Sequence, residues 1–134
     1  MFSKLILVLF VCTTLTGCSA PKISAGQHQA QPASLISHIV FVELNDPADY
    51  EAILADSDAM LATIPSVRQF AAGAHHDTGR TTISTDYDLA IYLGFDTNEG
   101  LSVYVAHPQH VAYVEKWKPR IRSLRVYDML DATR

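Results

Sequence analysis

Apolar side chains alternate with other residues over Tyr87–Asp96, and this alternation restricts the fold more than any other feature of the sequence. One face would carry Tyr87, Leu89, Ile91, Leu93 and Phe95. A period of two residues is that of a β-strand. Ile36–Leu44 alternates in the same way but is apolar on both faces, which predicts a central strand buried on both sides. His38 enters one of these apolar faces, either as a hydrogen-bonded core residue or as a contact for a ligand.

An interrupted helix is predicted after the alternating strand, over Thr97–Trp117. The residue before a proline avoids helical dihedrals, so His107 should end one helix and Pro108 should begin another. Tyr104 and His110 would lie about 240° apart on one unbroken helix. The break removes that constraint, and we expect both side chains to face one cavity.

The remaining segments complete a regular order of elements. An amphipathic helix is predicted over Asp46–Ile64, and Pro65 follows it. Further strands are predicted over Val67–His76 and Leu124–Leu130, with a polar connection over Asp77–Asp86. The order of strand, helix, strand, strand, helix, strand predicts an α+β, ferredoxin-like βαββαβ fold. Its four-stranded antiparallel sheet would have helices on one face.

The face of the sheet without helices is predicted to be partly apolar. Its apolar residues would be Ile39, Phe41, Tyr92, Tyr127 and Met129. An exposed patch of this kind usually has a partner. Two copies stacked sheet to sheet would bury it, so we expect a homodimer.

The first residues have the pattern of a secretory signal. Lys4 precedes an apolar run over Leu5–Leu15, which is too short to span a bilayer. Leu15-Thr16-Gly17-Cys18 then resembles the lipobox of bacterial lipoproteins. This resemblance implies a signal peptide over 1–17, lipidation of Cys18, a flexible tether over 18–35 and one folded domain over 36–134. The alternative is an ordinary secretory signal with an incidental cysteine.

The lipobox resemblance also implies a location. A lipidated Cys18 would hold the protein on the periplasmic face of a membrane. Ser19 follows the cysteine, where an aspartate would resemble the inner-membrane retention signal. In a Gram-negative cell this pattern points to the outer membrane.

The charge balance argues against nucleic-acid binding. The whole chain carries a formal net charge of −4. Nucleic-acid affinity comes largely from neutralising phosphates, so a net negative domain is a poor candidate. One local basic cluster is present, formed by Lys116, Lys118, Arg120, Arg122 and Arg125. It is either a solvated face or a contact for anionic lipid headgroups.

Five segments together resemble the Dabb, or stress-responsive dimeric α/β-barrel, domain family. They read SHIVFVEL at Ser37–Leu44, IPSVRQFAAG at Ile64–Gly73, YDLAIYLGFD at Tyr87–Asp96, YVAHPQH at Tyr104–His110 and RVYDM at Arg125–Met129. The resemblance implies a homodimer whose two sheets close into a barrel. This agrees with the expectation drawn from the apolar sheet face.

The same resemblance implies candidate site residues. A polyketide cyclase of this family uses a tyrosine and the second histidine of an H-P-x-H segment for a cofactor-free aldol ring closure. The matching residues here are Tyr104 and His110 as catalytic groups, and His38 as a pocket-side histidine. We also expect His107 and Tyr92 to contact a ligand. The sequence departs from the cyclase on the third strand, where Leu89 replaces a second pocket histidine.

The chemistry of these side chains leaves three functions open. His110 would be a general base that removes a proton from carbon beside a carbonyl, and Tyr104 would donate a hydrogen bond to the resulting oxyanion. The site would alternatively bind a small aromatic or polyketide-like molecule without turnover. The third alternative is a structural role in the cell envelope, with both groups only satisfying a buried kink. His107 and His110 lack an evident third ligand, so no metal or other cofactor is expected.

Overall fold

The structure is a computed structural model that describes residues 32–133, so the predicted signal peptide, Cys18 and most of the predicted tether lie outside it. The main elements are β1 (Ile36–Leu44), α1 (Tyr50–Asp56), β2 (Gln69–Gly73), β3 (Leu89–Phe95), α2 (Asn98–Ala106), α3 (Pro108–Trp117) and β4 (Ile121–Leu130). Short 3-10 turns cover Pro47–Asp49 and Lys118–Arg120. The strand order β2-β3-β1-β4, with every pairing antiparallel, is that of the predicted ferredoxin-like fold.

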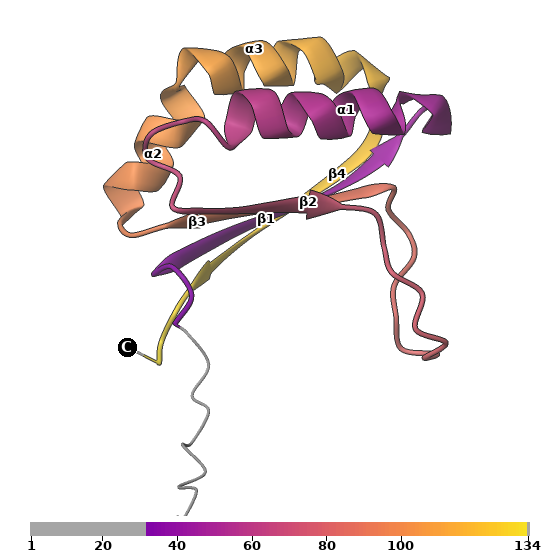
Figure 1. Cartoon of the computed structure of the whole chain (residues 1–134), viewed down its shortest axis with the longest axis horizontal. Helices are drawn as coiled ribbons and strands as arrows, with labels where there is room; N and C mark the ends of the chain where they lie inside the picture. Colours follow the sequence, from indigo (N-terminus) through magenta and orange to yellow (C-terminus); the bar gives the residue numbers. More distant parts are fainter. Residues whose placement is uncertain (1–31, 134) are drawn as a thin grey trace, which may run out of the picture. The chain divides into compact units, whose positions relative to one another are not determined.

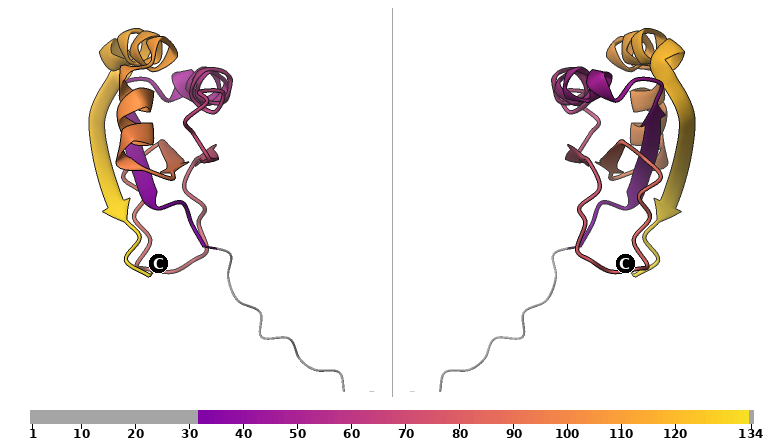
Figure 2. Two further views of the ribbon diagram at one scale, coloured as in Figure 1. Left: turned by 90° about the vertical axis from the view of Figure 1, so that its left-hand side faces the viewer. Right: turned by 90° about the vertical axis from the view of Figure 1, so that its right-hand side faces the viewer.

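All the helices lie over one face of the sheet, and β4 and β2 form its two edges (Figures 1 and 2). The core between the two layers consists of buried side chains from β1 and β3 and from the inner helix faces. It includes Val42, Leu44, Leu89, Leu93, Phe95, Ile53, Leu61 and Trp117. The predicted fold class is thereby confirmed, and β1 is a central strand as its two apolar faces predict.

The first helical segment is less regular than the sequence predicts. After α1 the chain forms a π-helical turn over Ser57–Leu61. Fully buried Ser57 donates from Oγ to the carbonyl of Ile53 at 2.7 Å and also bonds the Tyr113 hydroxyl at 2.8 Å. A serine hydroxyl that bonds the carbonyl four residues earlier competes with the regular ladder and bends helices. The bond to α3 fixes this distortion, and nothing in the local sequence of α1 indicates it.

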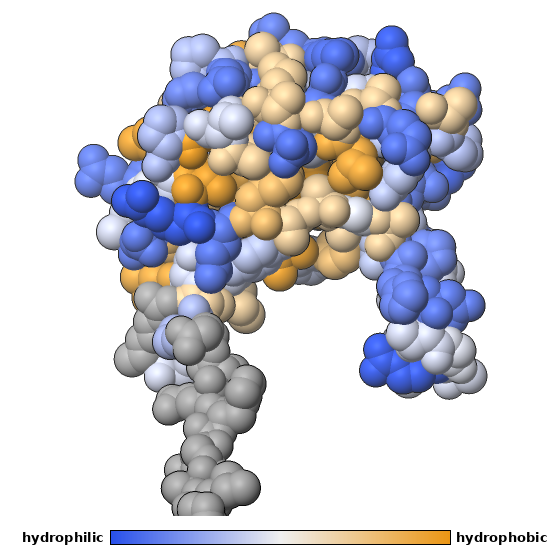
Figure 3. Space-filling view, viewed as in Figure 1, coloured by the Kyte–Doolittle hydropathy of each residue, from blue (hydrophilic) through white to orange (hydrophobic). Residues whose placement is uncertain are grey.

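Both predicted edge strands have shifted ends. β2 covers only Gln69–Gly73 of the predicted Val67–His76, because its partner β3 begins at Leu89 and leaves later residues unpaired. The connection between them extends away from the helix layer and is mainly hydrophilic (Figures 1 and 3). β4 begins at Ile121, three residues before the predicted strand, because Ile121 still pairs with Leu44.

The domain begins two residues before the predicted boundary. Ser34 is buried, and its backbone N–H donates to Gln69 Oε1 at 3.0 Å. The carbonyl of Leu35 accepts from the N–H of Asp131 at 2.8 Å. Ser34 packs so closely on β3 that a Cβ at Gly94 would lie 2.5 Å from its Oγ. Residues assigned to a flexible tether are therefore part of the folded unit, and Gly94 provides the space for them.

The open face of the sheet carries exposed apolar side chains. Tyr127 and Met129 of β4 are 55% and 52% exposed. Phe41 lies beside Tyr127, with 6.0 Å between the ring centroids. Ile39 is the register partner of Tyr127 and shares its face. The predicted apolar patch thus exists on the described domain, on the side away from the helices.

Candidate functional site

The interruption between α2 and α3 has the predicted construction. His107 is extended, with φ −66° and ψ 136°, so α2 ends at Ala106 and α3 begins at Pro108. The N–H of Gln109 donates to His107 Nδ1 at 3.3 Å, which makes His107 the N-cap of α3. The turn brings the rings of Tyr104 and His110 within 4.6 Å of each other, centroid to centroid.

A cavity of about 630 Å³ lies between the helices and the β1 and β4 side of the sheet. Tyr104, His110 and His38 line it, together with a mainly aliphatic and aromatic wall. The remaining lining residues are Val40, Val42, Leu61, Ile91, Leu93, Val105, Tyr113, Val114, Trp117, Lys118, Ile121, Arg122, Ser123, Leu124 and Val126. Small-molecule sites are typically ~300–1,000 Å³, mostly apolar and furnished with a few convergent polar groups. The cavity has these properties.

His38 is held by the carboxylate of Asp128, which is not among the predicted site residues. Asp128 of β4 is the register partner of His38, so the two side chains lie next to each other on one face. His38 Nδ1 and Asp128 Oδ1 are 2.6 Å apart, and the imidazole is buried while the carboxylate is half exposed. An Nδ1–H donated to a carboxylate fixes the tautomer of the imidazole. In that tautomer Nε2 carries no proton and is the acceptor nitrogen of the ring. The only sequence signal was a polar residue within the alternating stripe Leu124, Val126, Asp128, Leu130.

His110 is oriented in a comparable way across the helix break. Its Nδ1 lies 2.9 Å from the carbonyl oxygen of Val105. Nδ1–H therefore donates to this oxygen, and Nε2 is the nitrogen without a proton. Burial lowers the pKa of His110, the Val105 carbonyl opposes that effect, and the nearby charge of His38 adds to it. His110 is therefore a neutral imidazole near neutral pH, with Nε2 available as a proton acceptor.

Tyr104 is buried, yet its hydroxyl makes no hydrogen bond to any other residue in the described part of the chain. Burial raises the pKa of the phenol, and proximity to Tyr113 raises it further. Tyr104 therefore stays protonated and keeps a donor for a molecule in the cavity. The alternative in which Tyr104 and His110 pair with each other or with backbone is met only in part. His110 bonds the Val105 carbonyl, whereas Tyr104 only packs against the His110 ring.

Two of the predicted ligand-binding residues do not line this cavity. Tyr92 projects from the open face of the sheet, where its hydroxyl donates to Gln69 Oε1 at 2.8 Å. Its position follows from the two-residue period of β3, which puts it opposite Ile91 and Leu93. His107 is used as the cap of α3. The structure thus brings together Tyr104, His110 and His38, and it separates Tyr92 and His107 from them.

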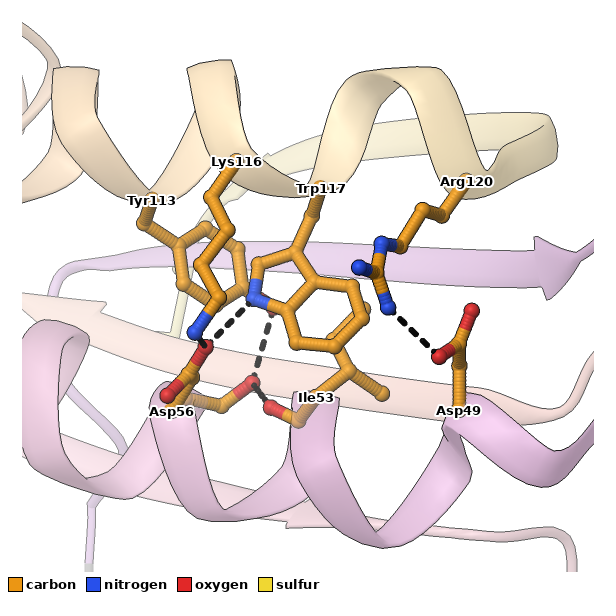
Figure 4. Close-up of polar contacts among 8 residues, drawn as sticks. Asp49, Ile53, Asp56, Tyr113, Lys116, Trp117 and Arg120 are labelled. Atoms are coloured by element: carbon orange, nitrogen blue, oxygen red, sulfur yellow. Dashed lines mark hydrogen bonds and ion pairs between the residues drawn. The ribbon is translucent and has the colours of Figure 1, made fainter.

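One wall of the cavity is fixed by polar contacts that join α1 and its preceding 3-10 turn to α3 and its following 3-10 turn (Figure 4). Trp117 is 1% exposed, and its Nε1–H donates to Asp56 Oδ2 at 2.8 Å. Lys116 Nζ pairs with the same carboxylate at 2.5 Å, and Arg120 pairs with Asp49 at 2.7 Å. Both cations lie 5.4 Å from the centre of the indole ring. The indole is therefore held at the cavity by its hydrogen bond, its packing and two flanking cations.

Tyr113 is the second aromatic group of this wall. It is buried, and its hydroxyl bonds Ser57 Oγ at 2.8 Å. Burial raises the pKa of Tyr113 to about 12, the bond to Ser57 opposes the rise, and the charge of Asp56 adds to it. The phenol is thus neutral at physiological pH and serves to position α3 on α1.

The described residues lack two other features that would bear on function. Within 32–133, no three His, Cys, Asp or Glu side chains are grouped so that they would hold a metal ion. Among the helices of the same residues, none has the length and apolar character needed to cross a membrane.

Comparison with known proteins places the domain in a family. The family model described as "Stress responsive A/B Barrel Domain", or Dabb, matches residues 36–131. The comparison with curated proteins gave no match.

Solved structures agree with this match. A dimeric ferredoxin-like protein of unknown function from Thermobifida fusca YX is 26% identical, with 71% of this chain and 89% of that chain covered and a TM-score of 0.60. A Dabb family protein from Mesorhizobium loti MAFF303099 is 24% identical over 71% of this chain and 94% of its own, at a TM-score of 0.61. A hydroxynitrile lyase from Passiflora edulis is 14% identical, with 77% of this chain and 98% of that chain covered. Its TM-score of 0.65 shows that the fold is shared.

Proposed function

The chain belongs to the stress-responsive A/B barrel (Dabb) domain family, and we propose that it binds a small aromatic or polyketide-like molecule in the cavity beside Tyr104 and His110. The observation that carries this proposal is the cavity itself. It combines about 630 Å³ of mainly apolar space with the side chain of Tyr104, whose hydroxyl bonds no other residue in the described part of the chain. A bound carbonyl or hydroxyl oxygen would accept a hydrogen bond from this hydroxyl.

Filling the cavity is expected to abolish binding without unfolding the protein. Val126 lines the cavity but is 47% exposed, so Val126→Trp adds bulk at an accessible position. The probe is 4-phenyl-2-butanone, an aromatic ketone. Its binding is measured by isothermal titration calorimetry. Val103→Trp is the matched control, because Val103 is 50% exposed on α2 and does not line the cavity. Equal affinity in the parent and in Val126→Trp would place the probe elsewhere and contradict the proposal.

A second candidate function, cofactor-free proton transfer, is favoured by the orientation of the two histidines. In this reaction His110 Nε2 takes a proton from carbon next to a ligand carbonyl. The electron pair of the broken C–H bond passes into an enolate, whose oxygen accepts a hydrogen bond from Tyr104. Donation of the proton from His110 back to carbon completes one cycle. Alternatively, the enolate carbon attacks a second carbonyl, and His110 then donates its proton to the alkoxide that forms. His38, oriented by Asp128, is a second imidazole at the same cavity.

We also propose that two copies assemble through the open sheet face. The exposed side chains of Tyr127 and Met129 support this, as do solved relatives whose names describe them as dimeric. Tyr127→Glu should turn the dimer into a monomer in analytical ultracentrifugation, because it places a charge in a desolvated contact. Val103→Glu, on the helix layer, should leave the sedimentation unchanged. A parent that sediments as a monomer at micromolar concentration would rule out this assembly.

We propose further that lipidation of Cys18 anchors the domain to a membrane, on the periplasmic side. The support is the sequence pattern around Cys18. Cells given radiolabelled palmitate should label the parent protein and not Cys18→Ser. Label in both proteins would exclude Cys18 as the lipidated residue.

A further inference from the structure

The cavity is lined by positively charged side chains, although the chain as a whole is net negative. The chain carries a formal net charge of −4. Two cationic side chains, Lys118 and Arg122, nevertheless line the cavity, and no carboxylate is among the described residues that line it. Arg122 is paired with Glu43, so Lys118 carries the positive charge at this cavity that is left for an anion.

Neighbouring cations are already paired, which distinguishes Lys118 from them. Lys116 is bound to Asp56, Arg120 to Asp49 and Arg122 to Glu43. Lys118 is exposed, and no carboxylate lies within ion-pair distance of it in the described part of the chain. Among these four neighbouring cations, Lys118 is the one that a ligand would neutralise without breaking an existing ion pair.

The two polar ends of the cavity are separated by an apolar wall. His110 lies near the start of α3 and Lys118 directly after its end, which is about 12 Å along the axis at ~1.5 Å per residue. Val114 and Trp117 lie between them on α3 and also line the cavity. A ligand that extends along this wall therefore needs an apolar body, with a polar group at the end that lies against Lys118.

We infer that the natural ligand is an anionic amphiphile, a carboxylic acid with a medium-length apolar body, whose carboxylate lies at Lys118 and whose other end reaches Tyr104 and His110. This inference rests on the proposed ligand-binding function and adds the charge class and orientation of the ligand. The carboxylate would displace water from an exposed ammonium group. Charge at Lys118 therefore contributes selectivity, and burial of the apolar body contributes most of the affinity.

Decanoate and decanol test the inference, because they share an apolar chain and differ in charge. Trp117 is the single tryptophan of the chain and lines the cavity, so its fluorescence reports occupancy. The parent should bind decanoate. Lys118→Gln should lower the affinity for decanoate by about fivefold, the upper range for an exposed ion pair, and leave the affinity for decanol unchanged. Arg80→Gln removes a positive charge from the β2–β3 connection and should change neither affinity. High salt should reduce the effect of Lys118→Gln.

Several outcomes would overturn the inference. If Lys118→Gln weakens decanol as much as decanoate, or if Arg80→Gln weakens decanoate equally, no carboxylate lies at Lys118, although the binding cavity stands. If neither compound nor 4-phenyl-2-butanone changes the fluorescence, the proposed binding function itself fails. Loss of binding to phosphatidylglycerol vesicles in Lys118→Gln, with decanoate unaffected, would assign Lys118 to a bilayer surface instead.

Discussion

Trp117→Ala is expected to lower the free energy of unfolding by about 3–5 kcal/mol, the range for truncating a buried aromatic residue. The indole is 1% exposed, and its removal enlarges a cavity that is already about 630 Å³. The change also removes the donor to Asp56 and the ring beneath Lys116 and Arg120. A domain of this size is stabilised by only ~5–15 kcal/mol, so a large part of its stability depends on this residue.

Urea unfolding followed by far-ultraviolet circular dichroism measures this effect without the tryptophan signal. Trp117→Phe keeps an aromatic ring and loses the hydrogen bond, so its cost should be clearly smaller. Lys116→Gln is a second comparison, because Lys116 is half exposed and its ion pair should contribute only ~0–1 kcal/mol. A loss below about 1 kcal/mol for Trp117→Ala would mean that α3 does not depend on the contacts with α1.

Local sequence rules were sufficient for the features that depend on neighbouring residues. The break at His107-Pro108 follows from the steric restriction that proline places on the preceding residue, and the structure contains it. The two-residue period placed His38 on the helix side of β1, where it lines the cavity. The same period put Ile39 and Phe41 on the open face. These predictions are confirmed because each depends on backbone geometry that a few residues determine.

Features that depend on pairing between distant segments were not predicted. Asp128 meets His38 only through the register of β1 and β4, which are 90 residues apart in sequence at this pair. The π-helical turn at Ser57 depends on a hydroxyl from α3. Tyr92 was expected at the ligand although its own alternation placed it on the opposite face of the sheet. A resemblance to a family gave the residue types at the site, but the register decided which of them share the cavity.

His110→Gln is expected to reduce proton exchange at the carbon next to a bound carbonyl by about 10²–10⁴-fold, the usual contribution of a general base. The assay follows deuterium incorporation into 4-phenyl-2-butanone in D₂O by nuclear magnetic resonance, with no cofactor added. Tyr104→Phe should slow the exchange by about 10²–10³-fold, because the enolate oxygen loses its donor. Both variants should still bind the ketone, since the apolar wall of the cavity is unchanged.

The pH dependence distinguishes a base at His110 from a merely structural residue. Burial lowers the pKa of His110 below its ordinary value of 6.5, so the neutral base persists as the pH falls through 6.5. Exchange should therefore decline only on an acid limb below pH 6.5. The unfolded chain binds this proton more readily than the folded one, so the free energy of unfolding should also fall as the pH drops below 6.5. In His110→Gln, the acid limb of the exchange rate should disappear. The part of the loss of unfolding free energy below pH 6.5 that comes from His110 should disappear as well.

His107→Gln is the matched control, because it makes the same substitution in the same H-P-x-H segment at a residue that does not line the cavity. His107 caps α3, so this variant should lose some stability, about 1 kcal/mol, and keep the exchange rate. Equal losses of exchange in His107→Gln and His110→Gln would attribute the effect to the helix break and not to a base. An unchanged rate in His110→Gln, with the ketone still bound, would leave the cavity as a binding site and end the case for catalysis by His110.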